Sequence, residues 1–306
     1  MRISTSQLYQ QGLKAIQDQQ TQVARVSNQL GTGRRLISPA DDPAASAAIV
    51  GLNEDLQRLE RFQTNADRAE SRLGLTETTL DSGINALQRL RELAITGLNG
   101  SQSAQSRADI AAEGRQLLDQ MIALGNTRDA NGEYIFGGFQ SQSQPFSQTA
   151  GVVSYNGDQG QRFIAVSENR QIAVTDSGSD IFMAAPAGGS ASAFTVMSDF
   201  VTAMETDRPQ DLDSPPRAAH ILDDIDAVMD NLSAARSSIG SRQRALDLQR
   251  NQNADAILRM EQTRSGLQDL DYAEAATNLS RHSAALEAAQ LSFSRIQGLS
   301  LFNFLR

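Results

Sequence analysis

The dominant feature of this sequence is an apolar residue at every seventh position over eight successive layers. The series runs through Ala45, Leu52, Leu59, Ala66, Leu73, Leu80, Leu87 and Ala94. Such a seam is typical of a long helix that packs along its length against other helices. Asp42 is the predicted N-cap, Pro43 the first helical residue, and Asn99-Gly100 the stop. A helix over residues 43–98 would be about 84 Å long at about 1.5 Å per residue, which no small globule contains.

The companion seam of this helix, four residues ahead, is less regular. Its apolar members are Ile49, Leu56, Ile84 and Leu98, and its polar members are Gln63, Glu70, Glu77 and Arg91. The centre of the seam is therefore expected to be partly exposed. A second long series lies toward the C-terminus, at Ile225, Leu232, Ile239, Leu246, Met260 and Leu267. Asn253 interrupts this series, and its phase changes near Asp271.

Both ends of the chain carry weaker amphipathic segments. The N-terminal one steps by sevens through Tyr9, Ile16, Val23, Leu30 and Ile37, with Gly12, Gln19 and Gly33 where a second seam should be. The C-terminal one steps through Tyr272, Leu279, Leu286 and Phe293, with Ala275, Ala289 and Ile296 three residues ahead. Neither segment has an obvious partner in the rod, and each would be marginal alone in water. Their apolar faces therefore indicate surfaces for another subunit.

The middle of the chain, residues 127–217, has a different pattern. A shorter helix over about 107–125 leads into the apolar run Tyr134-Ile135-Phe136, Gly137-Gly138 and two strand-like runs at 162–166 and 171–175, which together indicate hairpins. Residues 194–204 have helical spacing, and Pro209, Pro215 and Pro216 follow. This insert contains five arginines and eleven acids, so it carries six of the nine excess negative charges. An acidic insert of this kind suits a solvent-facing position.

These patterns predict a mainly α protein. We expect a long antiparallel helical rod, built from N- and C-terminal segments, that carries a small β-rich α+β insert domain. The predicted division is 1–42 with 271–306 as terminal assembly helices, 43–126 with 218–270 as the helical rod, and 127–217 as the outer insert.

Composition excludes several classes of protein. The chain has no cysteine, which excludes disulfides, thiolate metal sites and cysteine nucleophiles. Its net charge of -9 opposes nonspecific attraction to nucleic acid or an anionic membrane. No stretch approaches the roughly 18 apolar residues of a membrane span, and the N-terminus lacks the apolar core of a cleavable signal peptide.

Motifs that carry chemistry are not found, so we expect no catalytic residue, cofactor site or metal site. Phosphate loops, dinucleotide fingerprints, nucleophile elbows and HExxH are absent from the sequence. His220 and His282 read as ordinary helical histidines, and the acidic runs at Asp129 and at 176–180 read as turns. Arg34-Arg35 is interpreted as a solvated pair, and Gly137-Gly138 as a turn.

Several segments resemble one known family. LGTGRRLISPADDPAASAAIVGL at 30–52 and LDYAEAATNLSRHSAALEAAQLSFSRIQGLSLFNFLR at 270–306 are similar to the terminal segments of bacterial flagellins and their junction relatives. GEYIFGGFQSQSQPF at 132–146 and YNGDQGQRF at 155–163 resemble the hook–filament junction members of that superfamily, as does the start MRIST. The resemblance covers about two thirds of the chain, and residues 177–216 match nothing.

The resemblance implies a structural protein of the bacterial flagellum, without catalytic role, that joins hook and filament. It implies extracellular localisation after export without signal cleavage, and pairing of the two termini as helices. Implied partners are the protein itself, hook-associated protein 1, flagellin and an export chaperone, with no nucleic acid and no membrane. The expected assembly interface comprises Ile16, Val23, Leu30, Leu279, Leu286, Phe293, Ile296, Phe302 and Phe304.

Three alternatives stay open from the sequence. A short filament flagellin would share the termini but would polymerise along the whole filament. A cytoplasmic coiled-coil scaffold would need only the heptads, and not two amphipathic terminal segments. An enzyme is supported only by generic acids in the insert.

Overall fold

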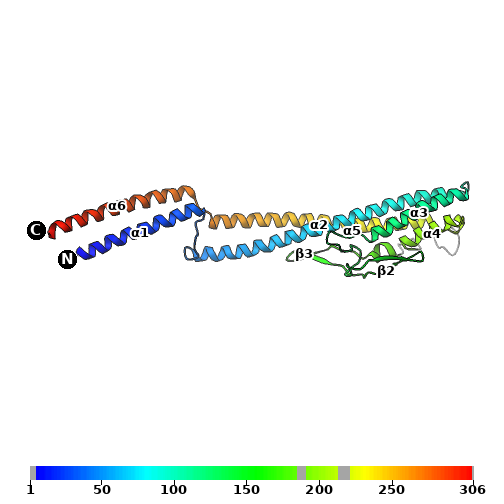
Figure 1. Ribbon diagram of the computed structural model, residues 1–306, viewed down its shortest axis with the longest axis horizontal. Helices are drawn as coiled ribbons and strands as arrows, with labels where there is room; N and C mark the ends of the chain where they lie inside the picture. Colours follow the sequence, from blue (N-terminus) through cyan, green and yellow to red (C-terminus); the bar gives the residue numbers. More distant parts are fainter. Residues whose placement is uncertain (1–4, 185–190, 213–220, 305–306) are drawn as a thin grey trace. The chain divides into compact units, whose positions relative to one another are not determined.

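The computed structural model describes residues 5–184, 191–212 and 221–304, and it is mainly helical (Figure 1). Its elements in chain order are α1 (Thr5–Thr32), α2 (Pro43–Gly97), α3 (Ala104–Gly125), β1 (Phe146–Thr149), β2 (Val152–Tyr155), β3 (Phe163–Ser167), β4 (Arg170–Ala173), η1 (Ser179–Met183), α4 (Ala193–Glu205), η2 (Pro209–Leu212), α5 (Ile221–Gln268) and α6 (Tyr272–Phe304). The expected fold class, mainly α with a small β-containing insert, is confirmed. The chain divides into two compact units, Met1–Arg58 with Ala256–Arg306 and Leu59–Asp255.

The ends of the long helices lie where their capping residues predict. The carboxylate of Asp42 accepts a hydrogen bond from the Ala45 N–H at 3.0 Å, and Pro43 opens α2. The change of phase near Asp271 is the break between α5 and α6. The Asp271 carboxylate caps α6 by accepting the N–H groups of Ala273 at 2.9 Å and Glu274 at 3.1 Å. Short polar side chains at these positions satisfy donors that the first helical turn leaves free.

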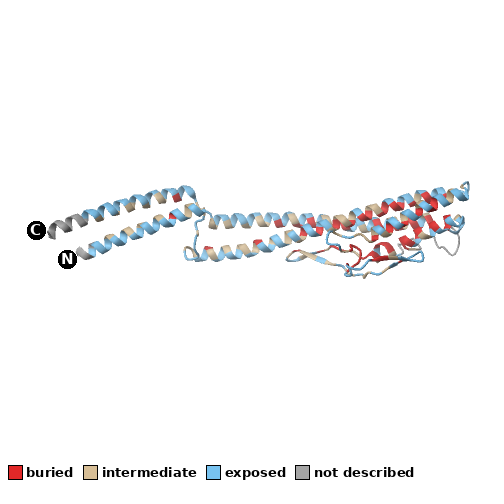
Figure 2. Ribbon diagram, in the orientation of Figure 1, coloured by how far each residue is buried: buried red, intermediate tan, exposed pale blue. Residues whose placement is uncertain are grey.

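The core of the 59–255 unit lies along the predicted seam of α2 (Figure 2). From Ala66 to Ala94, every member of the eight-layer series is fully buried. Residues from α3, α4, α5 and the hairpins and turns of the insert complete the cluster, among them Met121, Phe146, Phe200 and Leu232. The two long helices run antiparallel in this unit, because Arg91 pairs with Asp226 while Gln243 bonds Glu77.

Asn253, which interrupts the heptads of α5, ties the insert to the helices. Its side chain is 2% exposed, and its amide donates to the Val166 carbonyl at 3.0 Å. Its own oxygen accepts a hydrogen bond from Gln249 at 3.0 Å. From the facing helix, Asn65 donates to the neighbouring Ala165 carbonyl at 2.9 Å. Side-chain amides of both long helices therefore hold β3. The polar residue that interrupts the apolar series of α5 has a structural role, because it binds a strand of the insert.

The insert contains two separate antiparallel hairpins. β3 pairs with β4 so that Phe163 lies opposite Ala173, as the strand-like runs predict. β1 pairs with β2 so that Phe146 lies opposite Tyr155, around a turn in which Ala150 and Gly151 have φ of 51° and 84°. The sequence reading missed this first hairpin, because its strands are only four residues long and its turn lacks an Asn-Gly signal.

Tyr134-Ile135-Phe136 is not a strand, contrary to the expectation. The three residues are buried in a succession of turns, and the Phe136 ring packs edge-on against Phe182 at 5.2 Å between centroids. The glycines that follow do form a tight turn. Gly138 has φ of +68°, and a Cβ there would clash with the Asp158 carboxylate, so the loop needs a glycine at this position. Pro215, Pro216 and His220 lie outside the described residues.

The acidic run at Asp129 forms a turn held by arginines. One Asp129 oxygen accepts the N–H groups of Asn131 and Glu133 at 2.8 and 3.0 Å, and the other binds Arg72 at 2.9 Å. Glu133 contacts Arg72 at 3.2 Å and Arg162 at 2.7 Å. The turn is therefore attached to α2 and to the start of β3. The other run, at 176–180, is partly helical, because η1 begins at Ser179, and its Asp176 pairs with Arg242 at 2.8 Å.

Stability of the 59–255 unit is expected to fall in acid partly through Glu133. Burial alone would raise the pKa of Glu133, but hydrogen bonds and charges of Arg72 and Arg162 outweigh it and hold that pKa below its ordinary value. A lowered carboxyl pKa contributes stability above the unfolded pKa, and that contribution is lost as the pH falls through the folded pKa. We expect Glu133→Gln to lower the melting temperature by a few degrees at pH 7 and by less near pH 3. Thermal unfolding across this pH range, with the parent chain as reference, measures the effect; an equal difference at both pH values would contradict it.

Candidate assembly interface

The two terminal helices, α1 and α6, lie side by side and run antiparallel (Figure 1). The heptad patterns alone offered neither helix a partner within the chain, whereas the family resemblance implied that the two helices pair. In the structure they do pair. Their buried and half-buried positions alternate by four and three residues. In α1 this series is Gly12, Ile16, Gln19, Val23, Val26 and Leu30, and in α6 it is Ala275, Leu279, His282, Leu286, Ala289 and Phe293; Gln29, Asn278 and Ala285 are half-buried beside it. This spacing is that of a two-stranded coiled coil.

The three positions that weaken the N-terminal seam, two in α1 and one just after it, are each matched by a residue of α6. Gly12 lies under the Phe293 ring, where an added Cβ would be 2.8 Å from the ring edge. The Gln19 side-chain oxygen lies 3.0 Å from Nδ1 of His282. Gly33, with φ of +68°, lies beside the Tyr272 hydroxyl. The Tyr9 and Phe293 rings also contact, with 4.9 Å between their centroids. The apparent gaps in the N-terminal pattern are therefore complementary to the C-terminal helix.

The segment between α1 and α2 fastens this helix pair to the end of α5. The Arg35 N–H donates to the Gln268 carbonyl and its guanidinium to the Leu267 carbonyl, both at 2.8 Å. The Leu270 N–H in turn donates to the Gly33 carbonyl at 3.0 Å. Arg35 thus caps the C-terminal carbonyls of a helix, where a cation is favourable. The interpretation of Arg34-Arg35 as a purely solvated pair is wrong for Arg35.

Asp41 holds the same segment from the other side. Its carboxylate accepts the N–H groups of Ser38 at 2.9 Å and Ile37 at 3.1 Å, and it forms an ion pair with Arg25 at 2.9 Å. The two backbone hydrogen bonds, foremost that from Ser38, and the Arg25 charge keep the pKa of Asp41 below its ordinary value. The carboxylate is therefore ionised at neutral pH and braces the loop that leads into α2.

The predicted interface residues fall into two groups. Ile16, Val23, Leu30, Leu279, Leu286 and Phe293 are half-buried and lie on the seam between α1 and α6. The side chains of Ile296, Phe302 and Phe304 lie outside the part of the chain whose side chains the structure describes. The role of both groups in contacts between subunits stays a prediction.

Other large apolar side chains in this unit are exposed, and the expected assembly interface did not include them. Leu13 and Leu291 are 41% and 56% exposed, and Tyr9 and Tyr272 are 45% and 59% exposed. Figure 2 shows most of α1 and α6 as exposed, with half-buried positions interspersed along both helices. Stepping by sevens missed Leu13 and Leu291 because they lie off the seam. The signal that finds them is the set of apolar residues left over once the intramolecular seam has been filled.

Sites for other chemistry are sparse in the part of the chain that the structure describes. Within it, no three His, Asp or Glu side chains are grouped so that they could hold a metal ion. Within this part, no helix contains an apolar stretch long enough to span a membrane. His282 faces Gln19 in the helix pair, and Asp129 and Asp176 are bound to arginines.

Two family models match the ends of the chain. The bacterial flagellin N-terminal helical region matches residues 3–141, and the bacterial flagellin C-terminal helical region matches residues 222–305. Together they cover well over half of the chain. Of the solved structures, a putative flagellar hook-associated protein from Vibrio parahaemolyticus has a TM-score of 0.67 at 23% identity, over 75% of this chain and 100% of that one. The flagellar junction protein FlgL from Legionella pneumophila has a TM-score of 0.59 at 22% identity, over 72% and 100%. These structures share the fold.

The chain therefore belongs to the bacterial flagellin family, and it is a structural component of the flagellum. Within that family it is similar along its full length to flagellar hook-associated protein 3. Identity to this protein of Escherichia coli K12 is 28% over 99% of both chains, and to that of Salmonella typhimurium LT2 it is 26% over 100% of both. Flagellin FlaB1 of Treponema pallidum is 28% identical over only 40% of this chain and 43% of its own.

Proposed function

We propose that this chain forms the junction between hook and filament by self-assembly of exported subunits. The observation that carries the proposal is the full-length similarity to hook-associated protein 3, which includes the insert between the two flagellin regions. The filament alternative is less favoured, because flagellins FlaB1 and FlaB2 of Treponema pallidum match 40% and 71% of this chain, whereas the two hook-associated proteins match 99% and 100% of it. The cytoplasmic scaffold alternative is less favoured because it does not require paired terminal helices of the flagellin type.

The terminal helices would supply the assembly contacts. In the unit formed by Met1–Arg58 and Ala256–Arg306, buried apolar residues are few among those described, namely Val26, Ala45, Leu56 and Ala275. A helix pair with so little buried area is marginally stable by itself. Packing of Leu13, Leu291 and the predicted residues against neighbouring subunits would bury more apolar surface, so that ordering of the pair is coupled to assembly.

The proposal keeps the three-part division from the sequence. Residues 1–42 with 271–306 would assemble, 43–126 with 218–270 would form the helical support, and 127–217 would face outward. We infer hook-associated protein 1 and flagellin as neighbours and an export chaperone as a transient partner. Export would proceed without cleavage of a signal peptide, and the protein would have no catalytic role.

Immunogold electron microscopy tests the location. Antibody raised against residues 127–217 is expected to label a narrow band between hook and filament of intact cells, because the acidic insert would be exposed in the assembled form. Cells that lack the gene provide the control for antibody specificity. Label along the whole filament would instead establish a filament flagellin, and label confined to the cytoplasm would overturn the proposal in favour of a scaffold.

A further inference from the structure

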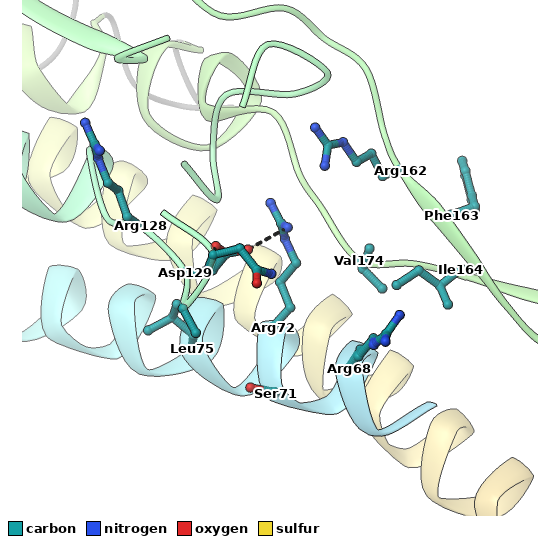
Figure 3. Close-up of a pocket in the computed structure, with 12 residues that line it drawn as sticks. Arg68, Ser71, Arg72, Leu75, Arg128, Asp129, Arg162, Phe163, Ile164 and Val174 are labelled. Carbon is teal, nitrogen blue, oxygen red and sulfur yellow. Dashed lines mark hydrogen bonds and ion pairs between the residues drawn. The ribbon is translucent and has the colours of Figure 1, made fainter. Parts of the chain in front are cut away.

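A basic pocket lies between α2, the Asp129 turn and β3, within the 59–255 unit (Figure 3). Its volume is about 1040 Å³, which is large enough for several side chains. We call it the arginine pocket, because Arg68, Arg72, Arg128 and Arg162 line it. No role in the assembly described above uses these residues.

The arginines of the pocket are only partly neutralised. Asp129 is the carboxylate among the described lining residues, and Arg72 already binds it. Arg162 is bound to Glu133. Arg68 and Arg128 are exposed, and neither has an ion-pair partner among the described residues. Arg128 instead stacks over the Tyr134 ring at 4.3 Å and donates to its hydroxyl at 2.6 Å. Within the described residues, the pocket therefore has two cations without a carboxylate partner, Arg68 and, at the far edge of the pocket, Arg128, which its aromatic neighbour holds in place (Figure 3).

An apolar wall lies on the side of the pocket that carries Arg68 and Arg162, opposite Arg128 (Figure 3). Phe163, at the start of β3, is 57% exposed, and Ile164 and Val174 lie beside it in Figure 3. Exposed arginine beside an exposed aromatic ring is typical of residues that anchor protein interfaces. An anchored guanidinium is also suited to carboxylates, which it can bind through two hydrogen bonds. A protein segment with acidic side chains fits this combination better than a free small anion, which would leave the apolar wall unused.

We propose that the arginine pocket docks an acidic segment of a second copy of this chain. The inference rests on the proposed function, because a junction places copies of the chain side by side. Charge complementarity supports this occupant. Each copy has a net charge of -9, and its residues 127–217 carry eleven acids against five arginines. A pocket on one copy and an acidic segment on the next form a head-to-tail contact, which can repeat around a closed ring.

Site-directed cross-linking tests the occupant. The chain has no cysteine, so Asn131→Cys, at the exposed rim of the pocket, gives a single thiol that can carry a benzophenone group. In the flagella, the labelled variant replaces the unlabelled subunit completely. The flagella are then isolated and irradiated. We expect a covalent dimer of this chain, in which mass spectrometry maps the second attachment to an acidic segment. Combining the label with Arg68→Glu and Arg128→Glu should lower the dimer yield about tenfold, because like charges then face each other.

Two controls separate the pocket from its surroundings. Arg244→Glu reverses an exposed arginine of α5 outside the pocket and should leave the dimer yield unchanged. Arg68→Lys with Arg128→Lys keeps the charge and should retain most of the yield. Cross-links solely to another protein, or a dimer yield insensitive to charge reversal, would overturn the inference while junction label by immunogold leaves the proposed function standing. Absence of that junction label would overturn both.

Discussion

Leu80→Asp is expected to unfold the 59–255 unit. Leu80 is completely buried in the seam of α2, and its cluster joins α2, α3, α4 and α5. The substitution removes a packed leucine and places a carboxylate in apolar surroundings, for a combined cost of about 5 kcal/mol or more. That cost is comparable to the whole free energy of unfolding of a typical domain. Circular dichroism during urea unfolding measures it, and we expect little cooperative unfolding at 25 °C.

A matched control for this substitution lies in the same helix. Ile95 is 51% exposed, so Ile95→Asp introduces the same charge without filling a buried site. We expect it to change the free energy of unfolding by about 1 kcal/mol or less. An unfolding midpoint for Leu80→Asp equal to that of the control would refute the assignment of the core to this seam.

Phe293→Asp is expected to abolish assembly while leaving the 59–255 unit folded. The Phe293 ring covers Gly12 and contacts Tyr9, so a carboxylate there loses the packing and lies against apolar surface. Leu286→Asp, on the same seam, should act in the same way. Spreading in soft agar reports assembly, and thermal unfolding of the purified variant reports the core. We expect motility to be lost and the main unfolding transition to stay within a few degrees of the parent.

The neighbouring exposed position provides the comparison. Ser292→Asp adds the same charge one residue away, on an exposed part of α6, and should retain motility. A motile Phe293→Asp strain would contradict the proposed role of the terminal pair. Loss of the main unfolding transition would instead contradict the separation between this pair and the core.

The sequence predicted the helices well, because their determinants are local and repeated. Asp42, Pro43 and Asp271 mark helix ends through their own side chains or ring. The heptads place Leu80 correctly in a core, but they also treat Leu59 as its equal, whereas the structure leaves Leu59 half-buried. A periodic pattern gives the face of a helix, but how many neighbours cover that face depends on the distant segments that pack there.

The insert and the candidate interface were less predictable for a different reason. The role of Asn253 depends on a carbonyl 87 residues away, and an isolated polar residue in a heptad does not show whether it has a partner. Gly12 and Gln19 weaken an amphipathic pattern when α1 is considered alone, and only the position of α6 explains them. Leu13 and Leu291 became candidates once the structure had assigned the seam residues to the intramolecular pair.

The matched contacts between α1 and α6 have a consequence for how the two chain ends find each other. A uniform leucine seam would tolerate a slip of seven residues, since each layer would meet another equivalent layer. Here such a slip would place His282 opposite Val26 and Phe293 opposite Gln19, without the hydrogen bond that now joins Gln19 to His282. A fully buried polar group left unsatisfied costs about 1–3 kcal/mol; Gln19 and His282 are half-buried, so their loss is smaller, but it still favours the native alignment over slipped ones. The irregular positions thus select a single alignment for two segments that are more than 250 residues apart in sequence.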